Sequence, residues 1–261
     1  KGRIGSEIDF GIKVAHEELD ITDPISIKSA LDKYSPSAVL NLASLDLNTS
    51  HANPILANNV NVFGVYNLIL ETEKRNLPLI LISSGAVFNG DITRVFTEQD
   101  TPNPVNIYGQ TKHIAEIILS QMRENYLIIR TGWLFGGKSG ATGFSKFINN
   151  SIDLSKRNES ITATSYQVGS PTYMPDFISK LKELIESDKR GLYHVVNEGG
   201  ASAVDIASYI IKMQNSSSQL NNISTPNVNP TTPKRSPSEA LKSESIQMRS
   251  WQDALSSYIN S

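Results

Sequence analysis

The sequence predicts an α/β protein built on a doubly wound parallel sheet with helices on both faces. Two short apolar stretches, residues 38–43 and 77–82, predict buried strands, and both alternate with amphipathic helical segments. Strands that are joined through helices need crossover connections, so they pair in parallel and are buried on both faces. In such sheets ligands bind at the carboxyl ends of the strands, and we expect the functional site there.

The first half of the chain supplies most of these elements. Asp23 is a candidate helix cap, Pro24 suits a first helical turn, and the apolar residues after them share one helical face: Ile27, Ala30, Leu31 and Tyr34. Residues 54–75 predict a long helix. A further helix over 108–125 precedes a third strand at 126–130.

The pattern is less regular in the second half. Helices are predicted over 144–156 and 175–187, and a strand over 191–196. Ser202 and Asp205 form a capping box that opens a further helix, ending at Met213. The stretch 215–238 is rich in Ser, Asn, Thr and Pro and is expected to be loop.

Composition excludes several classes of function. The 24 Lys and Arg nearly balance the 26 Asp and Glu, and no block of like charge suggests a partner nucleic acid or an anionic membrane. The apolar stretches are too short to span a bilayer. The chain has no Cys and only 4 His, which are scattered, so we expect no disulfide, thiolate or imidazole metal site. These observations predict a soluble, cytoplasmic protein.

The N-terminus resembles part of a phosphate-binding turn. Gly2 and Gly5 are spaced as in a glycine-rich turn whose backbone N–H groups face a pyrophosphate. We expect that a strand precedes Lys1, because the central strand of a doubly wound sheet would end there. Only residues 6–10 separate the turn from a strand-like stretch at 11–15, which is too short for a usual first helix. The choice between NAD and NADP is therefore not predicted.

Three side chains carry the predicted chemistry. Tyr108 and Lys112 lie four residues apart and therefore share a helical face. A neighbouring ammonium lowers the pKa of a phenol towards the range of a general acid. Ser84 ends the strand at 77–82, directly before the loop that leads to Tyr108. Together the three groups could polarise and protonate a carbonyl oxygen while a nicotinamide supplies a hydride.

The order and spacing of short segments resemble the extended short-chain dehydrogenase/reductase superfamily, and within it the dTDP-4-dehydrorhamnose reductase (RmlD-like) branch. The resemblance covers nearly the whole chain. Its segments are Gly2-Arg3-Ile4-Gly5, Glu18 to Asp23, Asn41-Leu42-Ala43, Asn61-Val62-Phe63-Gly64, Ser83-Ser84, Val87-Phe88, Tyr108-Gly109-Gln110-Thr111-Lys112, Arg130-Thr131-Gly132-Trp133, Gly169-Ser170-Pro171-Thr172, Gly191 to Val195 and Trp251 to Leu255.

The resemblance implies a role for each matched position. Ser84, Tyr108 and Lys112 would be the catalytic triad, and Asn61 a backbone clamp. The positions that would bind the cofactor, NADP or NAD, are Gly2, Arg3, Ile4, Gly5, Asp20, Ile21, Ala43, Tyr108 and Lys112. Those that would bind substrate are Ser84, Gly85 and Trp133. For Trp133, core packing is an equal alternative.

The implied architecture is an NAD(P)-binding Rossmann-like domain over 1–136 and a smaller mixed α/β substrate-binding region over 137–261, which can be interleaved with the first. The substrate region would hold a nucleotide diphosphate, for which Arg130, Lys138 and the pair Lys234-Arg235 are the available cations. Arg130 could equally form a structural ion pair. The resemblance allows a homodimer and places no metal ion.

The implied activity is the NAD(P)-dependent reduction of a nucleotide-activated 4-keto-deoxysugar, as in dTDP-rhamnose and polysaccharide biosynthesis. One departure bears on the substrate: Gly85-Ala86 stands where the reductases resemble one another in having Asp-Tyr. The residues after the strand at 38–43 also lack the acidic-basic run of the family. Two alternatives follow, an NDP-sugar 4-epimerase of the same superfamily and a nucleotide-binding regulatory subunit like the beta subunit of methionine adenosyltransferase.

Overall fold

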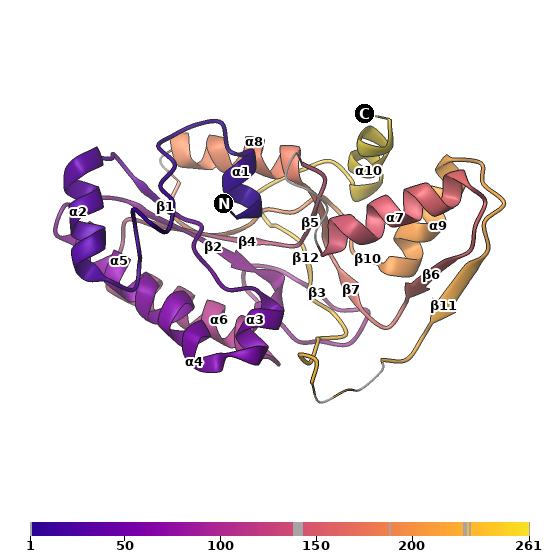
Figure 1. Cartoon of the computed structure of the whole chain (residues 1–261), viewed down its shortest axis with the longest axis horizontal. Helices are drawn as coiled ribbons and strands as arrows, with labels where there is room; N and C mark the ends of the chain where they lie inside the picture. The colour runs from indigo at the N-terminus through magenta and orange to yellow at the C-terminus, as the bar shows by residue number, and fades with distance from the viewer. Residues whose placement is uncertain (1, 138–142, 188, 227–228, 230, 261) are drawn as a thin grey trace.

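The computed structural model describes residues 2–137, 143–187, 189–226, 229 and 231–260. Its centre is a parallel sheet with the strand order β1-β2-β4-β9 (Figure 1). These strands are β1 (Val39–Asn41), β2 (Leu79–Ser84), β4 (Tyr126–Thr131) and β9 (Gly191–His194). The predicted doubly wound α/β fold is therefore confirmed, and every strand predicted for the sheet pairs in parallel.

Helices cover both faces of this sheet. On one face lie α2 (Pro24–Tyr34), α4 (Pro54–Asn58), η1 (Asn59–Phe63), α5 (Gly64–Glu73) and α6 (Ile107–Met122), and beside them α3 (Leu47–Ala52). On the other face lie α1 (Arg3–Glu7) and α8 (Met174–Glu186) (Figure 1).

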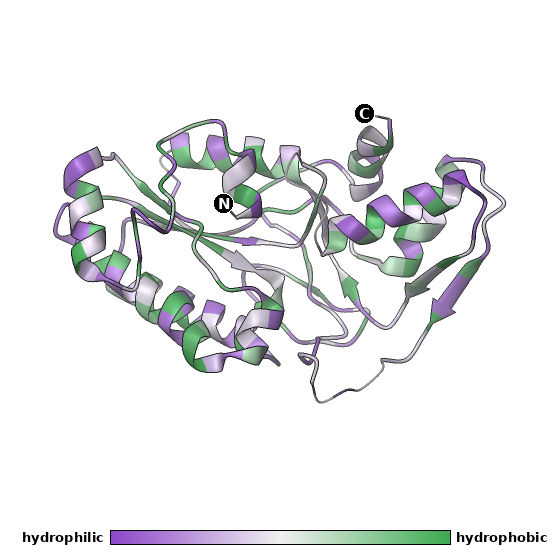
Figure 2. Ribbon diagram, in the orientation of Figure 1, coloured by the Kyte–Doolittle hydropathy of each residue, from purple (hydrophilic) through white to green (hydrophobic). Residues whose placement is uncertain are grey.

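Alternating side chains of β2 build the two cores. Leu79 and Leu81 pack with α2, α5 and α6, whereas Ile80 and Ile82 pack with α8. The strand is buried on both faces because successive residues point to opposite sides of the pleat. The hydropathy colouring agrees, since the central strands are largely hydrophobic and the helices carry stripes of both kinds (Figure 2).

The remaining elements form a smaller layer at the far end of the molecule (Figure 1). Its helices are α7 (Phe144–Lys156), α9 (Ala203–Met213) and α10 (Trp251–Ile259). Its strands pair as β5 (Trp133–Phe135) with β8 (Pro171–Tyr173), β6 (Ile161–Thr164) with β11 (Leu220–Ile223), β7 (Val168–Gly169) with β10 (Ala201–Ser202), and β3 (Val95–Phe96) with β12 (Ala240–Leu241).

Several local predictions are confirmed by these bounds. The Asp23 carboxylate accepts the N–H of Ile25 at 2.9 Å and caps α2. The capping box of Ser202 and Asp205 opens α9. The predicted helix over 54–75 is continuous in space but contains the π-helical turn η1.

Other predictions need correction. Residues 11–15 form no strand, because no neighbouring strand pairs with them and Gly11 adopts a positive φ of 68°. The expected loop at 215–238 contains the short strand β11, which is mostly exposed. Strand β9 and helix α8, which follow residue 136 in the chain, complete the central sheet and its core. The division into two domains at residue 136 stays a prediction.

Candidate active site

Ser84 lies at the carboxyl end of β2 and begins the short turn η2 (Gly85–Val87). Its Oγ accepts the backbone N–H of Ala86 at 3.2 Å, which fixes the side chain at the strand end. The hydroxyl of Ser84 also lies near enough to the side chain of Tyr108 to lower the pKa of that phenol. The structure therefore brings together two of the three predicted catalytic side chains.

Tyr108 stands in the first turn of α6. Asn106 caps this helix by accepting the N–H of Gly109 at 2.9 Å. Burial of the phenol, with the nearby Glu239 and Asp46 carboxylates, raises the pKa of Tyr108 to about 12, and the nearby Ser84 hydroxyl has an opposing, lowering effect. Tyr108 is thus a neutral phenol near pH 7, which can donate a proton.

Lys112 follows one turn later and is only 6% exposed. Its Nζ donates a hydrogen bond to the Ile82 carbonyl at 2.9 Å and lies 5.9 Å from the centre of the Tyr108 ring. Burial lowers the pKa of Lys112 to about 8, and the Glu116 carboxylate opposes this shift. The sequence predicted that the ammonium would lower the pKa of the phenol. In the structure burial dominates, and the pKa of Tyr108 is raised instead.

Asn61 joins two elements beside this site. Its Oδ1 accepts the N–H of Leu45 at 2.8 Å, and its Nδ2 donates to the hydroxyl of Thr111 on α6 at 3.0 Å. The side chain is buried within the π-helical turn η1. Such turns occur often at functional sites. These contacts agree with the backbone-clamp role implied for Asn61.

The glycine-containing N-terminus packs on the end of β1. A Cβ added to Gly5 would lie 3.5 Å from the Leu42 side chain, whereas one added to Gly2 would meet nothing within 4 Å. Ala43 follows Leu42 and is exposed. Gly2, Gly5 and Ala43 therefore lie at the same edge of the sheet as Ser84.

The other expected cofactor positions make contacts of their own. Arg3 donates to the Leu134 carbonyl at 2.7 Å and to the Ser145 hydroxyl at 2.9 Å, which ties α1 to β5 and α7. Ile4 packs against the core cluster around α8. Asp20 accepts the N–H of Thr22 at 2.8 Å, and Ile21 is buried in the core. Their contact with a cofactor stays a prediction.

Trp133 is half-buried and held from several sides. Its Nε1 donates to Glu239 Oε1 at 2.9 Å, and its ring lies 5.0 Å from that of Phe144. The bare Cα of Gly169 lies against the indole, where a Cβ would come within 2.2 Å of it. These contacts are compatible both with core packing of Trp133 and with a role for its indole in binding substrate.

Gly85 is covered by protein. A Cβ added to it would stand 2.6 Å from the carbonyl oxygen of Glu239, so the chain at Glu239 occupies the place of a side chain. The expected contact between Gly85 and substrate therefore has little room. Glu239 was not among the predicted site residues, because no local motif marks it and its place depends on a distant part of the chain.

Arg130 is a structural ion pair and not an available cation. Its guanidinium makes two hydrogen bonds to Glu116, at 2.9 and 2.7 Å, and both side chains are 4% exposed. Lys234 and Arg235 are exposed, and Lys138 lies outside the described residues. Of the cations proposed for a diphosphate, the exposed pair is the one that the described structure leaves accessible.

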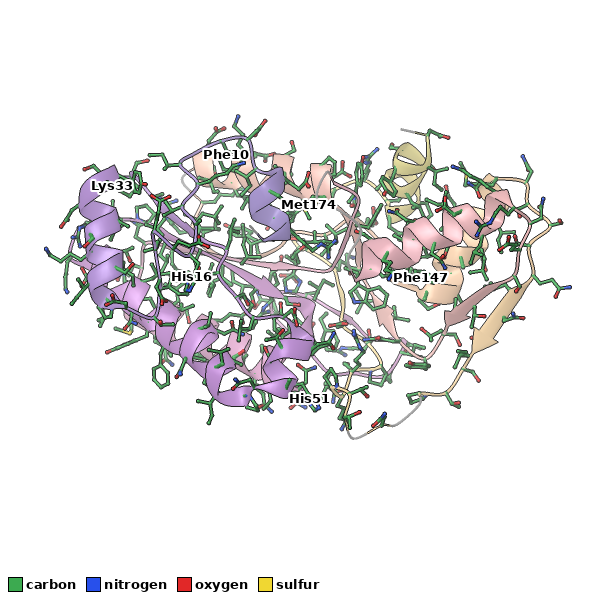
Figure 3. All side chains as sticks on the ribbon, viewed as in Figure 1. Phe10, His16, Lys33, His51, Phe147 and Met174 are labelled. Carbon is green, nitrogen blue, oxygen red and sulfur yellow. The ribbon has the colours of Figure 1, made fainter. Side chains whose placement is uncertain are left out.

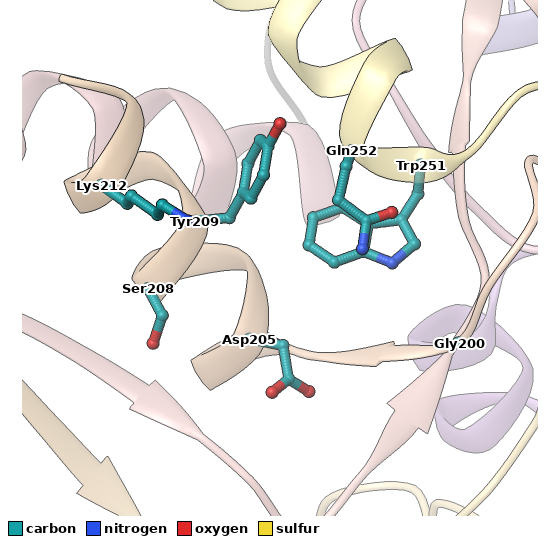
Figure 4. A pocket seen from close by; sticks show the side chains of 7 residues that line it. All are labelled: Gly200, Asp205, Ser208, Tyr209, Lys212, Trp251 and Gln252. Carbon is teal, nitrogen blue, oxygen red and sulfur yellow. The ribbon is translucent and has the colours of Figure 1, made fainter.

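The described residues offer no cluster of metal ligands, and the hollow described below lies outside the predicted site. Among the described residues no group of three or more His, Asp or Glu could hold a metal ion, and His16 and His51 lie on separate segments (Figure 3). A hollow of about 520 Å³ between α9 and α10 is lined by residues outside the predicted site: Gly200, Asp205, Ser208, Tyr209, Lys212, Trp251 and Gln252 (Figure 4). No helix in the described parts of the chain has the length and apolar character needed to cross a membrane.

The parallel α/β sheet with a Ser, Tyr and Lys gathered at a strand end defines a class, the extended short-chain dehydrogenases/reductases. The comparison with known families is specific. The RmlD substrate binding domain family matches residues 6–261, and the chain belongs to this family.

Individual relatives agree. The spore coat polysaccharide biosynthesis protein SpsK of Bacillus subtilis (strain 168) is 28% identical over 271 residues, covering 99% of this chain and 94% of that protein. A dTDP-4-dehydrorhamnose reductase of Aggregatibacter actinomycetemcomitans is 28% identical, covering 73% of this chain and 65% of that protein. The crystal structure of a dTDP-4-dehydrorhamnose reductase of Bacillus anthracis str. Ames in complex with NADP superposes with a TM-score of 0.83 at 27% identity, covering 95% and 88%.

Proposed function

We propose that this chain is an NAD(P)-dependent oxidoreductase that reduces the keto group of a nucleotide-activated 4-keto-deoxysugar. The observation that carries the proposal is the convergence of Ser84, Tyr108 and Lys112 at the end of β2. The relatives named as dTDP-4-dehydrorhamnose reductases support a dTDP-4-keto sugar as substrate.

The residues present fit a dinucleotide cofactor. Gly2 and Gly5 lie at the sheet edge beside Ala43, and without side chains they would let the backbone approach a pyrophosphate closely. Tyr108 and Lys112 lie at the adjoining strand end, suited to the nicotinamide half. The related structure in complex with NADP supports NADP as the cofactor, with NAD as the alternative. When bound, the reduced nicotinamide supplies the hydride.

The chain's own residues then handle the carbonyl oxygen. Ser84 and Tyr108 would donate hydrogen bonds to it, and they stabilise the negative charge that develops as the carbonyl is reduced. Tyr108 is the proton donor, because its high pKa keeps the phenol protonated across the physiological range. Lys112 would hold the nicotinamide ribose, and its ammonium would favour the phenolate that forms after the proton has left.

The test follows NADPH and NADH oxidation with dTDP-4-dehydrorhamnose as substrate. The wild type is expected to consume cofactor in step with substrate. Tyr108→Phe should lower kcat by about 100- to 10,000-fold while cofactor affinity changes little. Tyr66→Phe, on the exposed face of α5, is the matched control and should retain full activity.

The alternatives give different results. An epimerase would interconvert two nucleotide sugars without net consumption of cofactor. In a regulatory subunit, Tyr108→Phe would leave every measured property unchanged. Either outcome would contradict the reductase proposal.

We also propose that the protein acts in the cytoplasm and as a homodimer. Support for the first is that NAD(P)H and nucleotide sugars are cytoplasmic metabolites, and cell fractionation tests it. The dimer is an expectation from the family alone. Light scattering on the purified chain measures its mass directly, and a monomer would refute the dimer.

A further inference from the structure

Glu239 is fixed in place on both its backbone and its side chain. It directly precedes β12, and its backbone N–H donates to the Val168 carbonyl at 3.0 Å. Its Oε1 accepts two hydrogen bonds, from Trp133 Nε1 at 2.9 Å and from Gln167 Nε2 at 3.1 Å. Two neutral donors, one in β5 and one in the loop before β7, thus hold this oxygen in a defined direction.

This carboxylate belongs to the surroundings of the catalytic side chains. The carbonyl oxygen of Glu239 covers Gly85, the residue after Ser84, with only 2.6 Å to an added Cβ. The carboxylate is also close enough to Tyr108 to raise the pKa of that phenol. Burial raises the pKa of the Glu239 carboxyl, and the hydrogen bond from Trp133 opposes this shift. Glu239 therefore places a hydrogen-bond acceptor beside the atoms that would handle the keto group, where Gly85 itself offers no side chain.

The second carboxylate oxygen has no partner. Within the described residues no hydrogen bond reaches Oε2 of Glu239, and no cation lies within ion-pair distance of the side chain. Oε2 is not one of the buried side-chain atoms that lack a partner in the described structure, so it is accessible from outside the protein. A hydrogen-bond donor of a ligand could therefore reach it.

We propose that Glu239 is a specificity-determining residue, whose Oε2 accepts a hydrogen bond from a hydroxyl of the substrate's sugar ring. This assignment rests on the proposed function, because it takes the substrate to be a nucleotide sugar. The Glu239 side chain offers acceptor oxygens and no cation to a diphosphate. The proposal therefore assigns Glu239 to the sugar ring and not to the nucleotide.

The test measures binding in the presence of oxidised NADP, so that no turnover is needed. Calorimetry with dTDP-rhamnose and with dTDP alone separates the sugar from the nucleotide. Glu239→Ala should weaken the binding of dTDP-rhamnose by about 10-fold, the effect of losing one hydrogen bond, and change the affinity for dTDP by less than about twofold.

A second variant separates a loss of binding from a loss of folding. Glu239→Gln keeps an oxygen for Trp133 and Gln167 but replaces the accepting Oε2 by an amide, and it should weaken the sugar nucleotide in the same selective way. Glu244→Gln, an exposed carboxylate on the same segment, is the control and should bind both ligands as the wild type does. Thermal denaturation of each variant reports its folding.

Three outcomes would overturn the proposal: equal weakening of dTDP and dTDP-rhamnose, no weakening of either in the folded Gln variant, or a wild type that binds neither ligand. Selective weakening in a protein that reduces no keto sugar would instead retain Glu239 as a sugar-binding residue and refute the reductase activity. The two proposals can therefore fail separately.

Discussion

Gly109 lies so close to Ala86 that a Cβ added to the glycine would stand 2.1 Å from the Ala86 carbonyl oxygen. Real Cβ atoms do not approach backbone oxygen this closely, so only glycine allows the turn η2 to contact the first turn of α6. This contact is what brings Ser84, at the start of η2, within hydrogen-bonding reach of Tyr108.

Gly109→Ala should therefore separate the two catalytic hydroxyls. We expect the free energy of unfolding to fall by about 1–3 kcal/mol from overpacking, and kcat to fall by at least about tenfold through lost alignment. Urea denaturation and steady-state kinetics measure the two effects. Ser120→Ala, on the exposed face of the same helix, is the control. A stable Gly109→Ala variant with unchanged kcat would show that the close contact does not align the site.

The activity should depend on the ionisation of Lys112. Its pKa is lowered to about 8, so the ammonium form is lost as the pH rises through that value. Tyr108 stays protonated until about pH 12 and cannot cause the change. We expect kcat/KM, which reports ionisations of the free enzyme, to decline above about pH 8. In Lys112→Arg the guanidinium keeps its proton, so the remaining activity should lack this decline. The same decline in the variant would assign it to another group.

Stability should respond to pH in the opposite direction. Burial lowers the pKa of Lys112 from 10.5 in an unperturbed lysine to about 8 in the folded protein. Between these values the unfolded chain binds the proton more strongly, so the free energy of unfolding rises with pH. The gain from about pH 8 to about pH 10 should approach 2–3 kcal/mol relative to Lys112→Met, which has no such proton. Urea titrations of both proteins measure it, and parallel pH profiles would contradict the pKa shift.

The ion pair of Arg130 and Glu116 should serve stability. Because both side chains are 4% exposed, Arg130→Met leaves an unpaired buried carboxylate and should cost about 3–5 kcal/mol of unfolding free energy. The exposed pair of Arg157 and Glu159 provides the control, since Arg157→Met should change stability by less than about 1 kcal/mol. Because Arg130 is buried against Glu116 and is not available to a diphosphate, a folded Arg130→Met protein should bind dTDP as the wild type does. A selective loss of dTDP affinity at unchanged stability would return Arg130 to the nucleotide site.

Local patterns in the sequence predicted the central elements well. Three features arise from residues that are neighbours along the chain: the continuous burial of β2, the cap at Asp23 and the shared helical face of Tyr108 and Lys112. The strand expected at 11–15 failed because a strand needs a partner, and β11 was missed because its partner β6, not its own composition, makes it a strand.

The sequence by itself determined the alternation of helices and strands, the parallel sheet and the candidate triad, because periodicity and short spacings report local geometry. Only the tertiary structure decided that Arg130 is buried against Glu116, that the pKa of Tyr108 is raised, and that Glu239 faces the site. These properties depend on burial and on contacts between distant segments. A carboxylate becomes part of a binding site only when folding places it beside the groups that it serves.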